Sequence, residues 1–207
     1  MNIREEALRY LGYKGFVDEQ TEKLLSDAEA ALKVLKPSFC WRVFEKKECT
    51  HILIGEDINK HLQNSESIIL FAATLGVEAD RLIRTAEIEN MAYAVVLDSY
   101  ASAFIESYCD SCEKEMQIKT GGNYTWRFSP GYGDYPILVQ SQFISMISAD
   151  KNIGLTATEN HILVPRKSVT AIIGITDSIR EEKRNKCEFC SMNETCRLRK
   201  EGKNCGR

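Results

Sequence analysis

The spacing of apolar residues along the chain predicts alternating helices and strands. In residues 18–36, leucines and alanines recur at helical spacing, and Pro37 ends that segment. Residues 38–55 are typical of a strand, a charged turn and a second strand, and residues 56–65 of a short helix. Residues 67–76 form an almost continuous apolar run that ends at a glycine, which indicates a buried strand.

The segment 77–116 contains neither proline nor glycine, so it predicts one long helix or two consecutive helices. A second face of this segment carries Asp98, Ser102 and Glu106, which recur every four residues and form a polar line. This line is either an ordinary solvated helix face or the border of a ligand cleft. The apolar stripe of the segment consists of Tyr93, Leu97, Tyr100, Phe104 and Tyr108.

The last third of the chain returns to a mixed pattern. Residues 136–150 are amphipathic and predict a helix, and residues 161–177 predict two strands around a turn at Pro165. Strands come early and late, are separated by helices, and alternate as antiparallel strands do, so we expect an α+β fold. Neither a G-x-G-x-x-G pattern after a strand nor a P-loop pattern occurs, which gives dinucleotide-binding and P-loop functions no support.

Composition and charge narrow the class of protein. The 207 residues include no apolar run long enough for a membrane span, and the first residues are charged rather than signal-like, so we expect a cytoplasmic protein without a membrane partner. Residues 180–207 hold nine Lys and Arg against five Asp and Glu, although the whole chain has a net charge of −3. This basic tail has no run of aromatic residues for base stacking, and we expect no nucleic-acid partner.

The tail is also rich in cysteine. Cys187, Cys190, Cys196 and Cys205 have the spacing C-x2-C-x5-C-x8-C. Four thiolates so close in sequence can complete a tetrahedral zinc site or hold an iron–sulfur cluster, whereas free thiols or disulfides are the other interpretation. We therefore divide the chain into a domain of residues 1–178 and a Cys-rich, basic, metal-binding tail of residues 179–207.

One loop, "WRFSPGYGDYP" at residues 126–136, combines restricting and permissive residues. Pro130 and Pro136 fix their own φ angles and bias the residues before them towards extended geometry. Gly131 and Gly133 allow backbone conformations and close approaches that side chains forbid. We expect a rigid, ring-lined turn.

This loop, followed by "LTATENHILVPRKSVTAIIG" at residues 155–174, resembles the activation domain of cobalamin-dependent methionine synthase. The R-x-x-P-G-Y core and the later L-T … P-x-x-S-V-T segment occur in the same order, and "ILFAATLG" and "LDSYASAFIE" are also similar to free-standing versions of the domain. The resemblance extends to about residue 177. It implies a curved domain with a twisted antiparallel sheet and flanking helices.

The resemblance implies an accessory subunit for the reductive reactivation of methionine synthase. In that family the activation domain supplies S-adenosylmethionine as methyl donor to reduced cobalamin, while an electron donor such as flavodoxin or ferredoxin reduces the cobalt. The chain has no D-x-H-x-x-G pattern for offering histidine to cobalt. We therefore expect cobalamin on a partner chain, a cobalamin-bearing methionine synthase. The protein would be part of a methyltransferase system without being catalytic alone.

The resemblance also assigns candidate ligand-binding residues. Arg127 and Tyr132 match the arginine and tyrosine that bind S-adenosylmethionine in the family, and Gly131 lies in the same turn. A loop-stabilising salt bridge is the other interpretation for Arg127, and simple packing for Tyr132. The family has a glutamate at the position of Ser102 and another shortly before Arg127, and both are missing here. Helix spacing makes Glu106, one turn from Ser102, the candidate acceptor for the ligand ammonium.

A second function remains open at the level of sequence. A metal-tailed redox or interaction protein could serve another corrinoid protein without binding S-adenosylmethionine, and saturable binding of that ligand distinguishes the two. In either case a [4Fe–4S] cluster in the tail could pass an electron towards cobalt, whereas zinc would only fold the tail.

Overall fold

The computed structural model describes residues 2–13 and 15–176 of the chain. The predicted metal ligands Cys187, Cys190, Cys196 and Cys205, and the tail 179–207 that carries them, lie outside these residues. The described elements are, in order, α1 (Ile3–Tyr10), α2 (Glu19–Lys33), β1 (Ser38–Glu45), η1 (Lys46–Cys49), α3 (Glu56–His61), β2 (Ser67–Thr74), α4 (Val77–Glu89), α5 (Met91–Thr120), β3 (Asn123–Tyr124), η2 (Ile137–Val139), α6 (Gln140–Met146), α7 (Ala149–Ile153), β4 (Thr156–Ala157), β5 (Leu163–Val164) and β6 (Ser168–Thr176).

The centre of the fold is a four-stranded sheet with the strand order β1-β2-β6-β3. All its strand pairs are antiparallel; for example, Phe71 of β2 pairs with Trp41 of β1 on one side and with Ala171 of β6 on the other. A small antiparallel pair, β4 with β5, stands apart from this sheet. The α+β fold expected from the sequence, with an antiparallel sheet and flanking helices, is confirmed.

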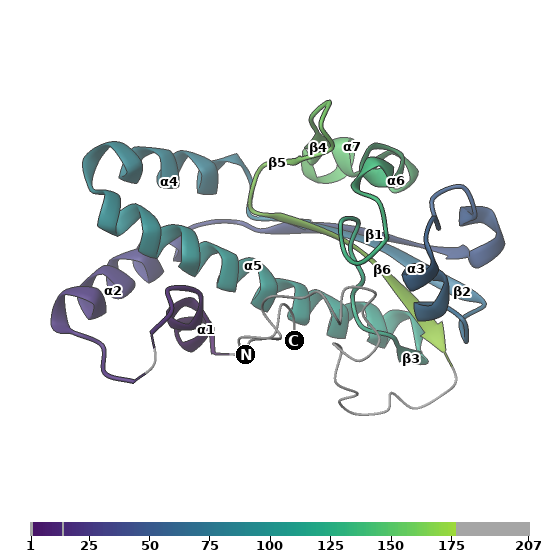
Figure 1. The fold of residues 1–207 in the computed structure, drawn as a ribbon, viewed down its shortest axis with the longest axis horizontal. Helices are drawn as coiled ribbons and strands as arrows, with labels where there is room; N and C mark the ends of the chain where they lie inside the picture. The colour runs from purple at the N-terminus through teal and green to yellow at the C-terminus, as the bar shows by residue number, and fades with distance from the viewer. Residues whose placement is uncertain (1, 14, 177–207) are drawn as a thin grey trace.

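The two faces of β2 bury different parts of the core. Ile69, Phe71 and Ala73 belong to the apolar cluster on the side of α5, whereas the intervening Ile68 and Leu70 belong to the cluster on the side of α3, α6 and α7. Successive side chains of a strand point to opposite faces of a sheet, so a strand with helices on both faces is apolar at every position. Figure 1 shows this arrangement, with α5 along one face of the sheet and α6 and α7 on the other.

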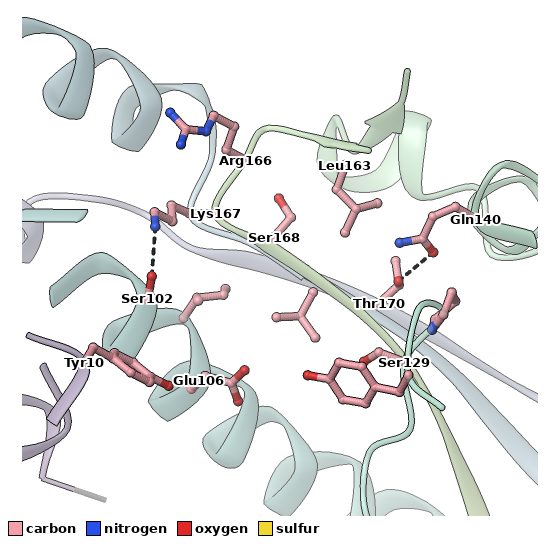
Figure 2. Close-up of a pocket in the computed structure, with 14 residues that line it drawn as sticks. Tyr10, Ser102, Glu106, Ser129, Gln140, Leu163, Arg166, Lys167, Ser168 and Thr170 are labelled. Atoms are coloured by element: carbon pink, nitrogen blue, oxygen red, sulfur yellow. Dashed lines mark hydrogen bonds between the residues drawn. The ribbon is translucent and has the colours of Figure 1, made fainter. Parts of the chain in front are cut away.

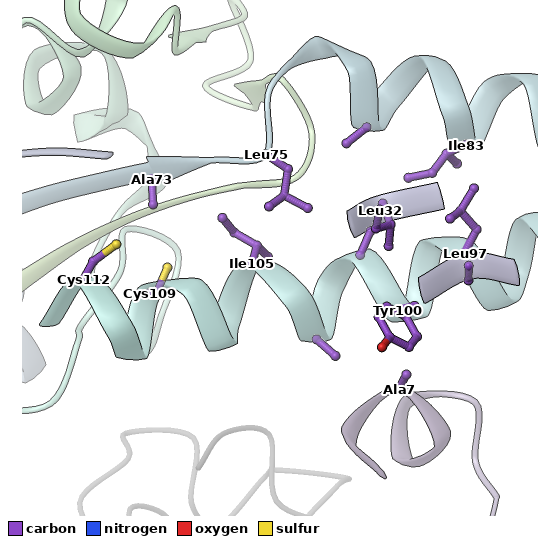
Figure 3. Packing of buried hydrophobic residues seen from close by; sticks show 14 of the residues in the cluster. Ala7, Leu32, Ala73, Leu75, Ile83, Leu97, Tyr100, Ile105, Cys109 and Cys112 are labelled. Atoms are coloured by element: carbon purple, nitrogen blue, oxygen red, sulfur yellow. The ribbon is translucent and has the colours of Figure 1, made fainter. Parts of the chain in front are cut away.

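Two consecutive helices occupy the long segment without glycine or proline. α4 ends at Glu89 because Asn90 is extended, with φ −156° and ψ 100°, and the Asn90 side chain then accepts the Tyr93 N–H at 3.2 Å to cap α5. α1, α2 and α4 all pack against α5. Figure 3 shows the buried face of α5, where Ile105, Cys109 and their neighbours contact the sheet and the surrounding helices. The predicted apolar stripe lies on this packed side of α5.

Two predicted elements are wrong. No second strand forms within residues 50–55; the Ile52 and Leu53 N–H groups bond to the Cys49 carbonyl instead, at 2.9 and 3.2 Å, and these buried side chains pack under the sheet. The continuous helix predicted for residues 136–150 is divided into η2, α6 and α7, since Ser148 has a left-handed φ of 51° between the last two. In both cases apolar spacing found the buried residues but not the backbone turns between them.

Within the described residues, no helix is both long and apolar enough to cross a membrane.

Candidate functional site

A cavity of about 320 Å³ opens between α5, the turn at residues 129–132 and the N-terminal part of β6. Its size lies at the lower end of the range for small-molecule sites, about 300–1,000 Å³. Figure 2 shows polar side chains from all three elements around it. The lining residues are Tyr10, Ser102, Ile105, Glu106, Ser129, Pro130, Tyr132, Gln140, Leu163, Arg166, Lys167, Ser168, Val169 and Thr170.

The turn that forms one wall is fastened to the sheet at its start. The Phe128 N–H donates to the Ile172 carbonyl at 3.0 Å, and the Ile172 N–H donates to the Phe128 carbonyl at 2.8 Å. His61 Nε2 lies 2.9 Å from the Trp126 carbonyl oxygen, and the His61 and Trp126 rings are in contact, with centroids 4.5 Å apart. The chain entering the turn therefore has a defined position beside β6.

The far end of the turn is fastened to α3. The Asp134 carboxylate accepts the N–H groups of Glu56 at 2.6 Å and Asp57 at 3.0 Å, which caps the first turn of α3. The two backbones can approach closely because glycines stand at the points of contact: Gly55 faces the Asp134 carboxylate, and Gly133 faces the Asp57 carboxylate. A Cβ atom at Gly55 would lie 2.6 Å from Asp134 Oδ1. Both glycines also have positive φ, 116° and 54°. The prediction that these residues permit close approach is confirmed for Gly133.

Arg127 makes a three-way salt bridge with α5. Its guanidinium donates to Glu113 Oε2 at 2.9 Å, to Asp110 Oδ1 at 2.8 Å and to Glu106 Oε2 at 3.2 Å. The side chain is only 14% exposed. Burial acts to lower the pKa of the guanidinium, but the acidic groups around it, Cys109 included, raise that pKa overall, so the side chain stays cationic.

The predicted binding residues divide into two groups. Glu106 and Tyr132 line the cavity, whereas Arg127 and Gly131 are not among its lining residues. Gly131 shapes the turn: its φ is 96°, and its N–H donates to the Tyr135 carbonyl at 2.8 Å. Arg127 reaches the cavity only through Glu106. The fold thus brings all four predicted residues to one side of α5, with two of them at the cavity wall.

The polar line predicted on α5 borders the cavity for part of its length. Ser102 and Glu106 line it, and Asp98, one turn before Ser102, forms a salt bridge with Lys167 at 2.8 Å. Lys167 also donates to Ser102 Oγ at 2.8 Å. Ser102 and Glu106 therefore border the cavity, whereas Asp98 does not line it and instead pairs with Lys167 of the opposite wall.

The sequence analysis did not find the polar residues that line the cavity just before β6, within β6 and at the first residue of α6. Arg166 and Lys167 follow Pro165 directly, so two adjacent cations within the second family-like segment were the available signal. Thr170 Oγ1 donates to Gln140 Oε1 at 2.8 Å, and both side chains are buried. No local pattern could have paired these two, because 30 residues separate them.

A metal centre is not formed by the part of the chain that the structure describes. Among residues 2–13 and 15–176, no group of three or more His, Cys, Asp or Glu side chains is placed to hold a metal ion. Cys40, Cys49, Cys109 and Cys112 are free thiols. The predicted tail site stays a prediction, since its four cysteines lie outside these residues.

Comparisons with known proteins support the fold. The sequence matches no protein-family profile and no curated protein. Among solved structures it matches the crystal structure of the MetH reactivation domain bound to AdoHcy, with a TM-score of 0.61 and 16% sequence identity. The match covers 97% of this chain and 83% of that chain. The chain therefore has the fold of that reactivation domain.

Proposed function

We propose that this protein is an accessory subunit for the reductive reactivation of a cobalamin-dependent methionine synthase and binds S-adenosylmethionine in the cavity beside α5. The observation that carries the proposal is the lining of that cavity, which offers the carboxylate of Glu106, the ammonium of Lys167 just before β6 and the aromatic ring of Tyr132. These groups suit a ligand with an α-amino acid at one end and an adenosine at the other. The fold of a reactivation domain bound to AdoHcy, an analogue of the same ligand, supports this choice.

Glu106 is the proposed acceptor for the ligand ammonium. One of its oxygens accepts from Arg127, and this bond sets the direction of the carboxylate. In this proposal Arg127 acts by positioning Glu106, and Gly131 by shaping the turn that presents Tyr132. S-adenosylmethionine would supply the methyl group for the cobalamin of the partner chain.

Tyr132 is the proposed wall for the sulfonium or the adenine. The residue is 55% exposed, so part of it is open to solvent where it lines the cavity. The ring packs edge-on against Phe128, with centroids 6.3 Å apart, which supports it from the side of the turn. An aromatic face attracts a cationic sulfur and also stacks on a base.

The proposed partner is the chain that carries cobalamin, because the structural neighbour is a domain of MetH. An electron donor such as flavodoxin or ferredoxin would reduce the cobalt on that chain. A [4Fe–4S] cluster in residues 187–205, with zinc as the alternative, remains part of the proposal.

Calorimetric titration with S-adenosylmethionine and with S-adenosylhomocysteine tests the binding step. We expect saturable binding, with about 10-fold or greater loss in Glu106→Gln and in Tyr132→Ala, because each removes one charged or aromatic contact. Glu115→Gln is the matched control: Glu115 lies on the same helix but pairs with Lys119 away from the cavity. Absence of binding by the unmodified protein would overturn the proposal and favour the metal-tailed redox or interaction protein.

The reactivation step has its own assay. The purified protein, a synthase inactivated as cob(II)alamin, a reductant and S-adenosylmethionine are mixed, and methionine formation is followed. We expect recovery of activity only in the complete mixture, and no methionine synthesis by this protein alone. Recovery no greater than in the mixture without this protein would contradict the assignment.

A further inference from the structure

We infer that Lys167, held by Ser102 and Asp98, is the subsite for the ligand carboxylate, so that the cavity recognises an α-amino acid zwitterion between Lys167 and Glu106. This inference rests on the proposed function and assigns the ligand carboxylate to a residue other than Arg127.

Arg127 is not available for a carboxylate of the ligand. Its two terminal nitrogens donate to three carboxylates of α5, and it does not line the cavity. A ligand carboxylate at Arg127 would have to displace one of these partners and would face the remaining acids. Among the residues that the structure describes, the cations that line the cavity are Arg166 and Lys167.

Lys167 is the better placed of these two cations. Its side chain is 11% exposed, whereas Arg166 is an exposed residue of the rim. Lys167 Nζ lies 2.8 Å from Asp98 Oδ1 and 2.8 Å from Ser102 Oγ. A lysine ammonium has three donors, and these two contacts leave one for a ligand. The buried stem and the two fixed contacts give this ammonium a defined position before the ligand arrives.

The spacing of the two charges fits an α-amino acid. Ser102, which holds Lys167, lies one helical turn before Glu106, so their Cβ atoms are about 5–6 Å apart on the same face of α5. Figure 2 shows Lys167 above Ser102 and Glu106 on the next turn of the same helix. An ammonium and a carboxylate on one carbon can reach both protein groups at once. A ligand without the amino acid would leave both unused.

The test compares two ligands on the same protein. S-adenosylhomocysteine contains the α-amino acid, whereas 5′-deoxy-5′-methylthioadenosine retains the adenosine and sulfur but lacks it. We expect the unmodified protein to prefer S-adenosylhomocysteine, and Lys167→Gln to lose about 10- to 100-fold of its affinity for it, as for a charged hydrogen bond. The affinity of Lys167→Gln for methylthioadenosine should stay within about 3-fold of that of the unmodified protein, because this ligand has no carboxylate for Lys167 to bind.

Lys119→Gln is the matched control, because it also removes one lysine and one salt bridge, Lys119 with Glu115, but outside the cavity. A second variant guards against misfolding of the first. Ser102→Ala changes a partly exposed helix position and removes the hydroxyl oxygen that accepts from Lys167. We expect it to reduce the preference for S-adenosylhomocysteine; an unchanged or stronger preference would overturn the inference.

The outcomes separate the two proposals. If the unmodified protein binds neither ligand, the proposed function fails and this inference fails with it. If the unmodified protein prefers S-adenosylhomocysteine and Lys167→Gln keeps that preference in full, only the inference is overturned. Equal losses for both ligands in Lys167→Gln also overturn it, because such losses show a general change of the cavity rather than the loss of a carboxylate subsite.

Discussion

Asp134 and Asp57, 77 residues apart in the sequence, each accept the backbone N–H of the other with their carboxylates. The Asp134 carboxylate accepts the Asp57 N–H at 3.0 Å, and the Asp57 carboxylate lies 3.3 Å from the Asp134 N–H, which donates to it. This reciprocal pair fastens the turn that carries Tyr132 to the start of α3. The position of one wall of the cavity thus depends on two aspartates that do not line it, the exposed Asp134 and the partly exposed Asp57.

Replacing Asp134 by alanine should weaken both the fold and the cavity. The helix α3 loses the acceptor for two N–H groups, and the loss of a helix cap lowers the free energy of unfolding by about 1 kcal/mol. The turn is then less restrained, so we expect several-fold weaker binding of S-adenosylhomocysteine. Urea unfolding followed by circular dichroism, and calorimetry, measure the two effects.

Asp18→Ala is the control for that variant. Asp18 caps α2 by accepting the Thr21 N–H at 2.9 Å, and the site of this cap is separate from the cavity. It should lower the midpoint of urea unfolding, because α2 loses its cap, and leave binding unchanged. Equal binding by Asp134→Ala and the unmodified protein would show that the turn needs no such restraint.

Replacing Arg127 by methionine should destabilise the protein. The change leaves Glu106, Asp110 and Glu113 facing one another without their cation, and we expect a loss of roughly 1–3 kcal/mol in the free energy of unfolding. Binding of S-adenosylhomocysteine should also weaken, because Glu106 loses the bond that directs it. Urea unfolding and calorimetry check the two parts separately.

The comparison for Arg127 is Arg9→Ala. Arg9 pairs with Glu6 one turn away on α1, and its own side chain is 54% exposed; salt bridges of such exposed cations contribute little, so we expect a change within about 0.5 kcal/mol. If Arg127→Met is as stable as Arg9→Ala, the three-way salt bridge is not the anchor of this loop.

The thiols of the described residues should react slowly in the folded protein. Burial raises the pKa of Cys40, Cys49 and Cys112 to about 11, and it also raises the pKa of Cys109. Only the thiolate is nucleophilic, so at pH 8 their alkylation by iodoacetamide should be about 100-fold slower than in urea, and should accelerate as the pH rises towards 11. Peptide mass spectrometry measures the rate at each cysteine. Rapid alkylation of Cys109 or Cys112 in the native protein would contradict the packing of α5 against the sheet.

The fourth prediction concerns metal binding by the cysteine-rich tail. We expect Cys187, Cys190, Cys196 and Cys205 to bind a [4Fe–4S] cluster, because four thiolates held close together repel one another without a metal. Anaerobic purification followed by iron and sulfide analysis should give a brown protein with about four irons. Serine at Cys190 and Cys196 should remove the colour. A colourless protein with stoichiometric zinc would instead establish the zinc alternative.

The candidate site was only partly accessible from sequence. Glu106 could be found from helix spacing, and Tyr132 from its family-like turn, because both signals are local. Lys167 could not be placed beside Ser102, which lies 65 residues away, and Arg127 could not be assigned to three acids of a helix that precedes it. Such pairs depend on how α5 packs against the sheet.

The sequence by itself determined the α+β class, a helical segment from residue 77 to about residue 116 and a buried strand within residues 67–76. These features follow from short-range rules: the period of apolar residues and the places where glycine and proline occur. Only the tertiary structure decided that residues 50–55 form a turn under the sheet, that Arg127 forms salt bridges with acids of α5, and that Lys167 donates to Ser102. The physical reason is that apolar spacing specifies which face of an element is buried, whereas the partner of a polar side chain is chosen by segments that meet only after the core has packed.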